Sequence, residues 1–379
     1  MADSAGDRKM RILHLIIVLG ETNGQYNEHC LPLMHEREIS IVTYYAPKLV
    51  PPPEITVFAG NGTFRGFFRA LRNALDAQRY DVVHAHAPQT GTLLVLAALA
   101  WGRLSQLRRS LVYTVQDSFH DYKPRNRAMM AISLAMFTRI VFCSRSAYES
   151  LPGILKRLVR GRWRVVQNGA DLDRVDRALA ARPPARDRTG FTVVSVGRLE
   201  PVKDPHTLLE AFSRAAGDTT GSLLTFVGTG PLLESLTGRA HALGLQDRVE
   251  FTGLIPREDV FVACASADVF VSTSHGEGLP VAVLEAMGAG CPVILSDIPP
   301  HRELAEGADF IPFVAPGDVE GSAAAIRRFR EMPPEARREI GRRCRSQMAS
   351  RFTLPIMRAG TEAVYREVAP SPGTMAGTA

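Results

Sequence analysis

The sequence predicts an α/β protein with two doubly wound, parallel-sheet domains in tandem. Short apolar runs alternate with stretches of helical period along most of the 379 residues, and this rhythm is typical of βαβ units. The alternation occurs in two series. A polar segment at 182–190, which contains two prolines and has the composition of a linker, separates them. A chain with 45% hydrophobic and 22% charged residues can bury two cores of ordinary size.

Each series predicts six strands. In the first we expect strands at 12–19, 39–44, 82–86, 111–115, 140–144 and 164–167, with helices at 64–77 and 92–104. In the second we expect strands at 191–196, 223–227, 249–252, 269–272, 292–296 and 310–313, with helices at 206–216, 231–243 and 282–289. The expected domains are 1–185 and 186–350, followed by a helical segment at 351–368 and a disordered tail at 370–379. Ligands are expected at the carboxyl ends of the strands and in the cleft between the domains.

The composition argues against several classes of protein. No run approaches the ~20 apolar residues of a membrane-spanning helix. The polar segment 1–9 is not followed by the apolar region of a signal peptide. The five cysteines are odd in number and widely spaced, so we expect reduced thiols in a cytoplasmic protein.

Positive charge is concentrated in the first half of the chain. There are 25 Lys and Arg against 15 Asp and Glu through Arg182, and 20 against 24 after it. This asymmetry favours an anionic partner for the first domain. The densest basic cluster, 156–164, surrounds Trp163; it fits either peripheral contact with an anionic membrane or a solvated helix face. No nucleic-acid recognition motif accompanies the charge, so nucleic acid is not an expected partner.

Two glutamates eight positions apart are the most informative feature. Glu277 follows the expected strand 269–272, and Glu285 lies inside the next helix. Both carboxylates can face one crevice, and the helix N-terminus between them offers N–H groups and a partial positive charge, which suits phosphate. This arrangement can hold a nucleotide sugar, with hydroxyls at the carboxylates. The alternative is one capping and one surface glutamate.

Two further glycine-containing segments follow strands of the second domain. Gly197 precedes Arg198 and Lys203, two cations that can pair with a diphosphate or else form a surface salt-bridge cluster. Gly228 and Gly230 form a Gly-x-Gly before a helix, as in dinucleotide-binding proteins, but the third glycine of that fingerprint is missing.

Several segments resemble the retaining glycosyltransferases of family 4, which have the GT-B fold. The likeness rests on Glu277-Gly-Leu-Pro with Leu284-Glu-Ala-Met, Gly197-Arg-Leu with Lys203, Phe251-Thr-Gly-Leu-Ile-Pro256, Asp81-Val-Val-His-Ala-His86 and Asn168-Gly-Ala-Asp171. It spans about 11–366 and is stronger in the second half. The resemblance implies two Rossmann-like domains facing a central cleft, the first for the acceptor and the second for the donor. It also implies a C-terminal helix, 351–379 with its tail, that packs back on the first domain.

The resemblance implies roles for residues of the second domain. Arg198 and Lys203 would bind the donor diphosphate and stabilise the leaving nucleotide. Glu277 would hold the transferred sugar, and Glu285 the ribose hydroxyls. Backbone amides at the helix start would add to phosphate binding. The other implied donor-binding residues are Gly197, Gly228, Gly230, Leu254, Ile255, Gly278, Leu279, Pro280 and Val281.

In the first domain, the resemblance places Gly20 and Gly24 in a loop beside the transferred sugar, although this loop is poorer in glycine than is usual. It implies that His86 points into the cleft. Gln116 stands where the family usually has histidine next to the donor sugar. Glutamine can orient a ligand but cannot take up a proton near neutral pH, and His120 is an alternative replacement.

Asp171 and Asp173 form an Asp-x-Asp pair, a pattern that holds Mg²⁺ or Mn²⁺ in other transferases. Here the pair falls in the Asn168-Gly-Ala-Asp turn near the linker. Because Arg198, Lys203 and a helix dipole already supply positive charge, we predict no required metal and no cofactor.

We therefore expect a retaining hexosyltransferase that uses a nucleoside-diphosphate sugar, UDP in preference to GDP, and an acceptor hydroxyl. The expected catalytic residues are Glu277, Arg198, Lys203, His86 and Gln116. The basic first domain fits a lipid-linked saccharide of a cell-envelope polymer, reached from the cytoplasm or from the inner face of the membrane. The alternatives are a soluble natural-product acceptor, an epimerase of the same architecture, an NAD-dependent oxidoreductase and a catalytically degenerate binding protein.

Overall fold

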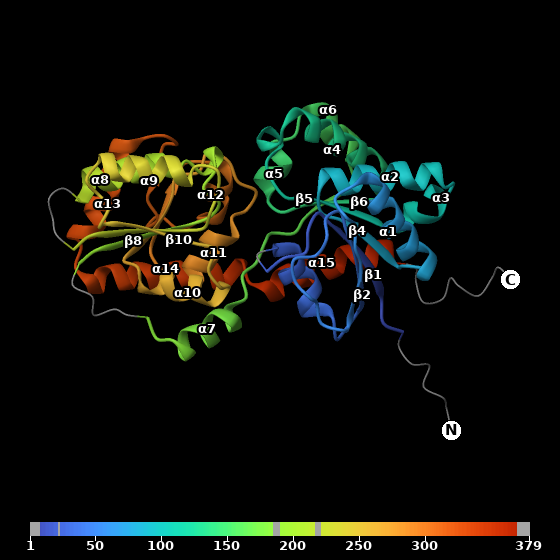
Figure 1. The fold of residues 1–379 in the computed structure, drawn as a ribbon, viewed down its shortest axis with the longest axis horizontal. Coiled ribbons are helices and arrows are strands. Elements are labelled where there is room, and N and C mark those ends of the chain that lie inside the picture. The colour runs from blue at the N-terminus through green and yellow to red at the C-terminus, as the bar shows by residue number, and fades with distance from the viewer. Residues whose placement is uncertain (1–7, 22, 185–189, 217–220, 370–379) are drawn as a thin grey trace, which may run out of the picture. The chain divides into compact units, whose positions relative to one another are not determined.

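The protein is described here by a computed structural model, which covers residues 8–21, 23–184, 190–216 and 221–369. The chain forms two compact units, Met1–Val166 with Arg358–Ala379 and Gln167–Met357. Each unit contains one parallel sheet flanked by helices (Figure 1). The predicted class, two parallel-sheet α/β domains in tandem, is confirmed. The predicted tail at 370–379 and the centre of the predicted linker, 185–189, lie outside the described residues.

The first unit has a seven-stranded sheet in the order β3-β2-β1-β4-β5-β6-β7. Its strands are β1 (Arg11–Ile16), β2 (Glu38–Thr43), β3 (Ile55–Phe58), β4 (Val82–Ala85), β5 (Leu111–Val115), β6 (Arg139–Phe142) and β7 (Trp163–Val165). The longer helices are α1 (Phe64–Ala77), α2 (Pro88–Ala100) and α4 (Pro124–Met136). The shorter ones are η1 (Gln25–Cys30), η2 (Leu31–Leu33), α3 (Leu104–Leu107), η3 (Arg108–Ser110), η4 (Phe119–Asp121), α5 (Arg145–Glu149) and α6 (Gly153–Leu158).

The second unit has a six-stranded sheet in the order β10-β9-β8-β11-β12-β13. Its strands are β8 (Thr192–Val196), β9 (Leu223–Val227), β10 (Val249–Gly253), β11 (Val269–Ser272), β12 (Val293–Ser296) and β13 (Phe313–Val314). Its helices are α7 (Leu172–Ala181), η5 (Pro201–Lys203), α8 (Pro205–Ala216), α9 (Leu233–Ala242), α10 (Arg257–Ser266), α11 (Val281–Gly288), α12 (Pro299–Leu304), α13 (Val319–Glu331) and α14 (Pro334–Arg351). The last helix, α15 (Leu354–Val368), continues into the first unit.

Each predicted strand overlaps an observed one, and β3 is an additional strand that was not predicted. It has only four residues, it follows the prolines at 51–53, and it pairs with β2 alone at the sheet edge. Short edge strands of this kind carry a weak sequence pattern.

The unit boundaries lie at 166/167 and 357/358, whereas the expected boundaries are 185/186 and 350/351. The segment after residue 166 joins the second unit through specific contacts. The Asn168 side-chain amide donates to the Leu279 carbonyl, at 2.8 Å. The Ala170 backbone is hydrogen bonded to Phe352 and Leu354, and α7 packs against α10.

Apolar cores lie on both faces of the second sheet. One contains side chains of α8, α9 and α13, and the other contains side chains of α10, α11 and α14. Figure 1 shows these two helical layers above and below the strands of that unit. The second sheet is therefore enclosed, as expected for parallel strands with continuous apolar sequences.

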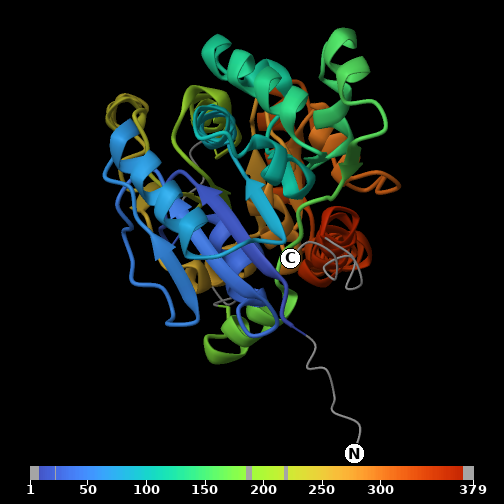
Figure 2. The same cartoon turned by 90° about the vertical axis from the view of Figure 1, so that its right-hand side faces the viewer.

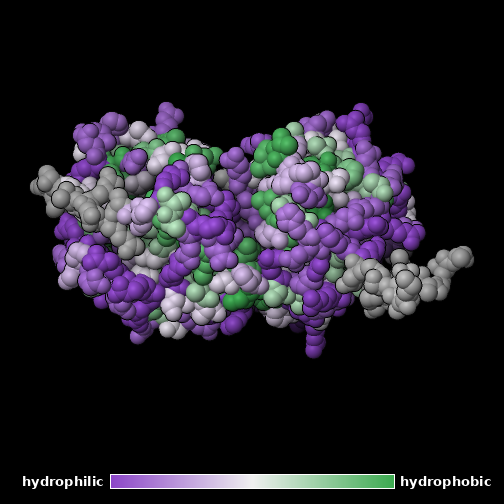
Figure 3. Space-filling model, turned by 90° about the horizontal axis from the view of Figure 1, so that it is seen from below, coloured by the Kyte–Doolittle hydropathy of each residue, from purple (hydrophilic) through white to green (hydrophobic). Residues whose placement is uncertain are grey.

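All five cysteines are buried, and none of them forms a disulfide. Within the described part of the chain, no helix is both long and apolar enough to cross a membrane. On the face drawn in Figure 3, hydrophilic residues predominate and apolar ones form only small patches.

The two faces of the first sheet differ in chemistry. Leu13, Leu15 and Val83 point into an apolar core that also contains side chains of α1, α2 and α4. Because side chains alternate along a strand, His14 and His84, which are direct partners across β1 and β4, point to the opposite face. There α15, red in Figure 2, contributes Tyr365, whose hydroxyl lies 2.7 Å from His84 Nδ1.

Four buried histidines gather on that face. They are His14, His29, His84 and His86. Burial lowers the pKa of His14 to about 3, helped by the positive charge that His29 would carry, and burial lowers the pKa of His29 to about 4. Burial also holds the pKa values of His84 and His86 well below the ordinary range. These imidazoles are therefore neutral in the folded protein at pH 7.

Acid should unfold the first unit through these histidines. Their pKa values are lower in the folded than in the unfolded chain, so the unfolded state binds more protons below about pH 6.5. The free energy of unfolding should be constant above that pH. Below about pH 6.5, the free energy of unfolding should fall by about 1.4 kcal/mol per pH unit for each histidine that stays neutral in the folded state.

The measurement is urea unfolding between pH 7.5 and 5.0 in the presence of a chelator, followed by tryptophan fluorescence. Both tryptophans, Trp101 and Trp163, belong to the first unit and report on it alone. His120→Gln, at an exposed side chain, is the control and should leave the profile unchanged. A flat profile from pH 7 to 5 would contradict the assignment.

Candidate functional site

The strand order of the second sheet identifies its ligand-binding edge. The chain moves outward from β8 to β9 and β10, then returns to place β11 on the other side of β8. The reversal leaves a crevice between the carboxyl ends of β8 and β11, which is where doubly wound sheets bind ligands. Lys203 follows β8 and Glu277 follows β11, so both come to this switch point.

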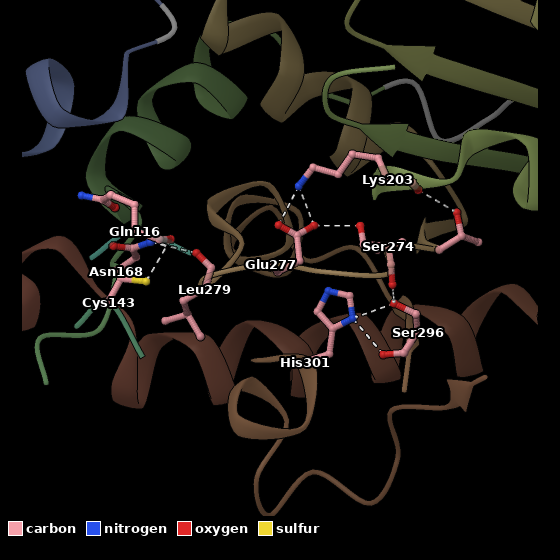
Figure 4. A network of polar contacts seen from close by, with 11 residues as sticks. Gln116, Cys143, Asn168, Lys203, Ser274, Glu277, Leu279, Ser296 and His301 are labelled. Carbon is pink, nitrogen blue, oxygen red and sulfur yellow. Dashed lines mark hydrogen bonds and ion pairs between the residues drawn. The ribbon is translucent and has the colours of Figure 1, made fainter. Parts of the chain in front are cut away.

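Lys203 and Glu277 form the central ion pair of the site (Figure 4). Lys203 Nζ lies 2.6 Å from both carboxylate oxygens of Glu277. The Ser274 hydroxyl donates to the same carboxylate at 2.7 Å. The Glu277 side chain is only 8% exposed, whereas that of Lys203 is 27% exposed. The carboxylate is therefore held from within the protein, and the ammonium group lies nearer the solvent.

A second layer of hydrogen bonds fixes the Ser274 loop. The Ser296 hydroxyl, at the end of β12, donates to the Ser274 carbonyl at 2.6 Å. His301 Nδ1 lies 2.9 Å from the Ser296 carbonyl and 3.1 Å from its hydroxyl. Because both oxygens act as acceptors here, His301 carries its proton on Nδ1. Burial lowers the pKa of His301, so the ring is a neutral support.

Arg198 does not join this pair in the structure. Its side chain is 71% exposed and contacts Glu200 at 2.8 Å. An exposed pair of this kind contributes little to stability. The guanidinium is therefore available to exchange partners at the edge where Lys203 lies.

Glu285 is buried inside α11 and is paired with Arg257, a residue that the sequence analysis did not single out. Arg257 Nη2 lies 2.5 Å from Glu285 Oε1, and Nε lies 2.6 Å from it. Burial raises the pKa of Glu285, and the Arg257 charge acts in the opposite direction. The first turn of α10 thus brings a cation to the second predicted carboxylate.

The segment before α11 combines a buried turn with the helix N-terminus. Leu279 is buried, and its carbonyl accepts from Asn168. Pro280 is the N-cap and makes no side-chain capping bond. It has no N–H, so Gly278, Leu279 and Val281 carry the amides of this segment. The first turn of α11 keeps N–H groups and the positive end of the dipole for an anion.

Gly197, Gly228 and Gly230 lie where the loops after β8 and β9 approach each other closely. A Cβ at Gly228 would collide with the Gly197 carbonyl, and one at Gly230 would collide with the Leu199 carbonyl. Gly228 (φ 134°) and Gly197 (φ 157°) also have left-handed backbones, which favour glycine. Backbone packing therefore accounts for the Gly-x-Gly of this strand without a dinucleotide.

Two predicted base-contacting residues follow β10. Leu254 is 68% exposed, which is unusual for a large apolar side chain, whereas Ile255 packs against the apolar core of α10 and α11. Leu254 thus offers an apolar surface at the same edge of the sheet as Lys203.

The first sheet has its own switch point, between β1 and β4. Gly20 and Gly24 follow β1, and Gly24 is the N-cap of η1. His86 follows β4, but it points inward, with Nε2 2.9 Å from His14 Nδ1. This ring is buried in the histidine cluster.

Gln116 follows β5. Its backbone N–H donates to the Tyr122 hydroxyl, at 3.2 Å, and its carbonyl accepts from the Cys143 thiol. The backbone of Gln116 is thus fixed at the carboxyl edge of the first sheet. His120 lies on η4 with an exposed side chain near Asp121. Asp171, from the Asp-x-Asp pair, caps α7 by accepting from the Arg174 N–H at 2.9 Å, which is a structural role.

Two family descriptions match the chain. Residues 26–174 match Glycosyltransferase Family 4, and residues 176–347 match Glycosyl transferases group 1.

Three relatives show how far the likeness extends. A glycogen synthase from Mycobacterium tuberculosis is 32% identical over 324 residues, which cover 82% of this chain and 74% of the relative. A UDP-Gal:alpha-D-GlcNAc-diphosphoundecaprenol alpha-1,3-galactosyltransferase from Escherichia coli is 29% identical, with coverage of 60% and 61%. An exopolysaccharide phosphotransferase from Streptomyces coelicolor is 36% identical over 149 residues. This match covers 38% of the present chain and only 16% of the length of that protein.

Solved structures confirm the fold. A sucrose-phosphate synthase from Thermosynechococcus elongatus superimposes with a TM-score of 0.75 at 21% identity, covering 94% of this chain and 98% of the other. Anabaena HepE in complex with UDP and glucose gives 0.72 at 18% identity, covering 94% and 100%. With the two parallel-sheet units, the two family matches and the glycogen synthase relative, the chain belongs to the group 1 and family 4 glycosyltransferases of GT-B type.

Proposed function

We propose that this glycosyltransferase moves a hexosyl group from a nucleoside-diphosphate sugar, UDP in preference to GDP, to an acceptor hydroxyl with retention at the anomeric carbon. The proposal rests on the ion pair between Lys203 and the buried Glu277 at the switch point of the second sheet. Glu277 precedes the N-terminus of α11 by a few residues.

The cationic side of this edge suits a diphosphate. Lys203 is partly exposed, and the exposed Arg198 side chain is paired with Glu200. Both can turn to phosphate oxygens while the first turn of α11 offers N–H groups. Each charged contact of this kind contributes ~1.5–3 kcal/mol.

The two carboxylates suit hydroxyl groups. When Lys203 shifts toward phosphate, Glu277 keeps its bond from Ser274 and can accept from a sugar hydroxyl. Glu285, oriented by Arg257, would accept from the ribose. The exposed Leu254 would cover one side of the base. The donor thus replaces interactions that the free site already makes, so little reorganisation is required.

The reaction follows from these contacts. The bond between the anomeric carbon and the diphosphate oxygen breaks as the acceptor oxygen attacks from the same face. The departing phosphate takes the acceptor proton, and Lys203 and Arg198 stabilise its charge. Gln116 would orient the sugar without exchanging a proton. No metal is required, since these cations and the helix dipole neutralise the diphosphate.

One relative and one solved structure support a lipid-linked acceptor and a UDP donor. The galactosyltransferase relative is named for UDP-Gal and a diphosphoundecaprenol acceptor, and HepE was solved with UDP and glucose. Within the basic segment 156–164, Trp163 is stacked on Tyr148 and Arg162 donates to backbone carbonyls. The exposed Ile154, together with Lys156 and Arg157 on α6, would be the part that contacts an anionic membrane.

Lys203→Met should strongly reduce turnover. Removal of the ammonium group takes away the charge that stabilises the departing diphosphate, so release of nucleoside diphosphate from the preferred sugar nucleotide should fall about 100- to 1000-fold. The assay measures that release with a panel of UDP- and GDP-sugars. Arg239→Met, which removes a surface cation paired with Glu210, is the matched control. Equal turnover by wild type and Lys203→Met would contradict the mechanism.

Two substitutions should separate ribose binding from phosphate binding. Glu285→Gln should weaken UDP about tenfold and leave inorganic pyrophosphate unaffected, because only UDP carries ribose hydroxyls. Arg198→Ala should weaken both ligands by about tenfold or more, as expected for loss of a charged contact. Titration calorimetry on variants with unchanged melting temperatures gives the affinities. Wild-type affinity for UDP in both variants would refute the site assignment.

A further inference from the structure

The buried histidine cluster of the first unit is not used by the proposed transfer reaction. His14 lies on β1, His84 on β4, His86 directly after β4, and His29 on η1. The ring centroids of His84 and His86 are 3.9 Å apart, and those of His14 and His29 each lie 5.2 Å from that of His86. Four imidazoles in one buried region call for a chemical reason, because polar groups are rarely buried without partners.

The hydrogen bonds of the cluster are incomplete. His84 is satisfied, since Nδ1 lies 2.7 Å from the Tyr365 hydroxyl and Nε2 lies 2.6 Å from the Thr114 hydroxyl. His14 Nδ1 and His86 Nε2 share one hydrogen bond of 2.9 Å. The outer nitrogens, His14 Nε2 and His86 Nδ1, are buried and have no hydrogen-bond partner among the described residues.

Tautomers cannot repair this deficit. If His14 donates to His86, then His86 carries an N–H on its outer nitrogen and His14 has an outer lone pair. If His86 donates, the two outer groups are exchanged. In either case one buried N–H and one buried lone pair stay unmatched, and each such group costs about 1–3 kcal/mol. A metal ion that takes one lone pair from each ring would leave no lone pair unmatched. It replaces the His14–His86 hydrogen bond, and each ring then carries its N–H on the nitrogen that does not bind the ion.

We propose that His14, His84 and His86 bind a divalent transition-metal ion of the Zn²⁺ class, and that this ion is structural. One nitrogen from each of these residues lies within 4.8 Å of the others. In a tetrahedral zinc site the ligand nitrogens are about 3.3 Å apart, so small ring movements close the site. In the proposed site His29 or a water molecule would supply the fourth ligand.

The protonation state of the cluster fits this ligand. A metal requires imidazole lone pairs, and burial keeps these rings unprotonated by lowering their pKa values. Nitrogen donors select Zn²⁺, Co²⁺, Ni²⁺ or Cu²⁺ over Mg²⁺ and Ca²⁺, which prefer oxygen. The histidine site therefore differs in its ligand chemistry from a site for the kind of metal ion that binds a diphosphate.

The hydroxyl groups around His84 indicate what a bound ion would stabilise. In the proposed site Nε2 of His84 binds the ion and gives up its contact with the Thr114 hydroxyl. Nδ1 keeps its contact with the hydroxyl of Tyr365 on α15, which holds the ring, as in many metal sites. The ion would thus link β1 and β4 and strengthen the attachment of the C-terminal helix to the sheet.

The test uses metal-free wild-type protein titrated with Zn²⁺, and with Co²⁺ as a spectroscopic probe. We expect one equivalent of Zn²⁺ to bind, a rise in the melting temperature of the first unit, and the intense visible absorption of tetrahedral Co²⁺. The exposed-site control His120→Gln should behave as wild type. Binding should be at least 100-fold weaker in His14→Asn.

A milder variant guards against loss of folding in His14→Asn. Tyr365→Phe keeps all three ligands and should weaken Zn²⁺ binding about 10- to 100-fold, the usual effect of removing such a partner. The proposal is overturned if wild type binds no stoichiometric Zn²⁺, if His14→Asn binds it as tightly, or if bound Co²⁺ shows only the weak absorption of the octahedral aqua ion. None of these results depends on nucleotide-sugar binding, so the proposed transferase activity stands or falls separately.

Discussion

The ion pair between Lys203 and Glu277 is the interaction on which the account of the site depends. A carboxylate that is 8% exposed needs a charged partner, because an unpaired buried charge is strongly destabilising. The Ser274 hydroxyl bonds the carboxylate directly, and Ser296 and His301 hold Ser274 in place. The ammonium group is the mobile partner, and a diphosphate can draw it away while a sugar hydroxyl takes its place. Donor binding is then an exchange of contacts within a site whose polar groups are already oriented.

The fold could be predicted from the sequence because parallel strands enclosed by helices give apolar runs at regular spacing. The edge strand β3 escaped prediction since four residues after a run of prolines carry little periodicity. The course of 167–171 could not be predicted either. Its attachment depends on contacts with Leu279, Phe352 and Leu354, more than a hundred residues away, and nothing in its composition marks them.

Individual site residues were also predictable to different degrees, because contacts between residues distant in the sequence carry no local signal. Lys203 and Glu277 come together because the strand order brings the ends of β8 and β11 side by side. Arg257 carries no motif, and only the packing of α10 on α11 reveals it. The contact between His86 and His14, which lies 72 residues earlier, is found only through the register of β1 and β4. Short-range motifs locate the strand ends, and the direction of each side chain comes from tertiary packing.

The central claim is that the carboxyl edge of the second sheet binds a nucleoside diphosphate. The most direct measurement is a thermal-shift panel of UDP, GDP, ADP and NAD on the wild-type chain, with all four ligands at the same high concentration. Saturation at 100 times the dissociation constant stabilises a protein by ~2.7 kcal/mol, enough for a clear shift. The account predicts a shift with UDP that exceeds the shift with GDP and none with NAD. A shift with NAD alone, or with none of the four, would contradict it.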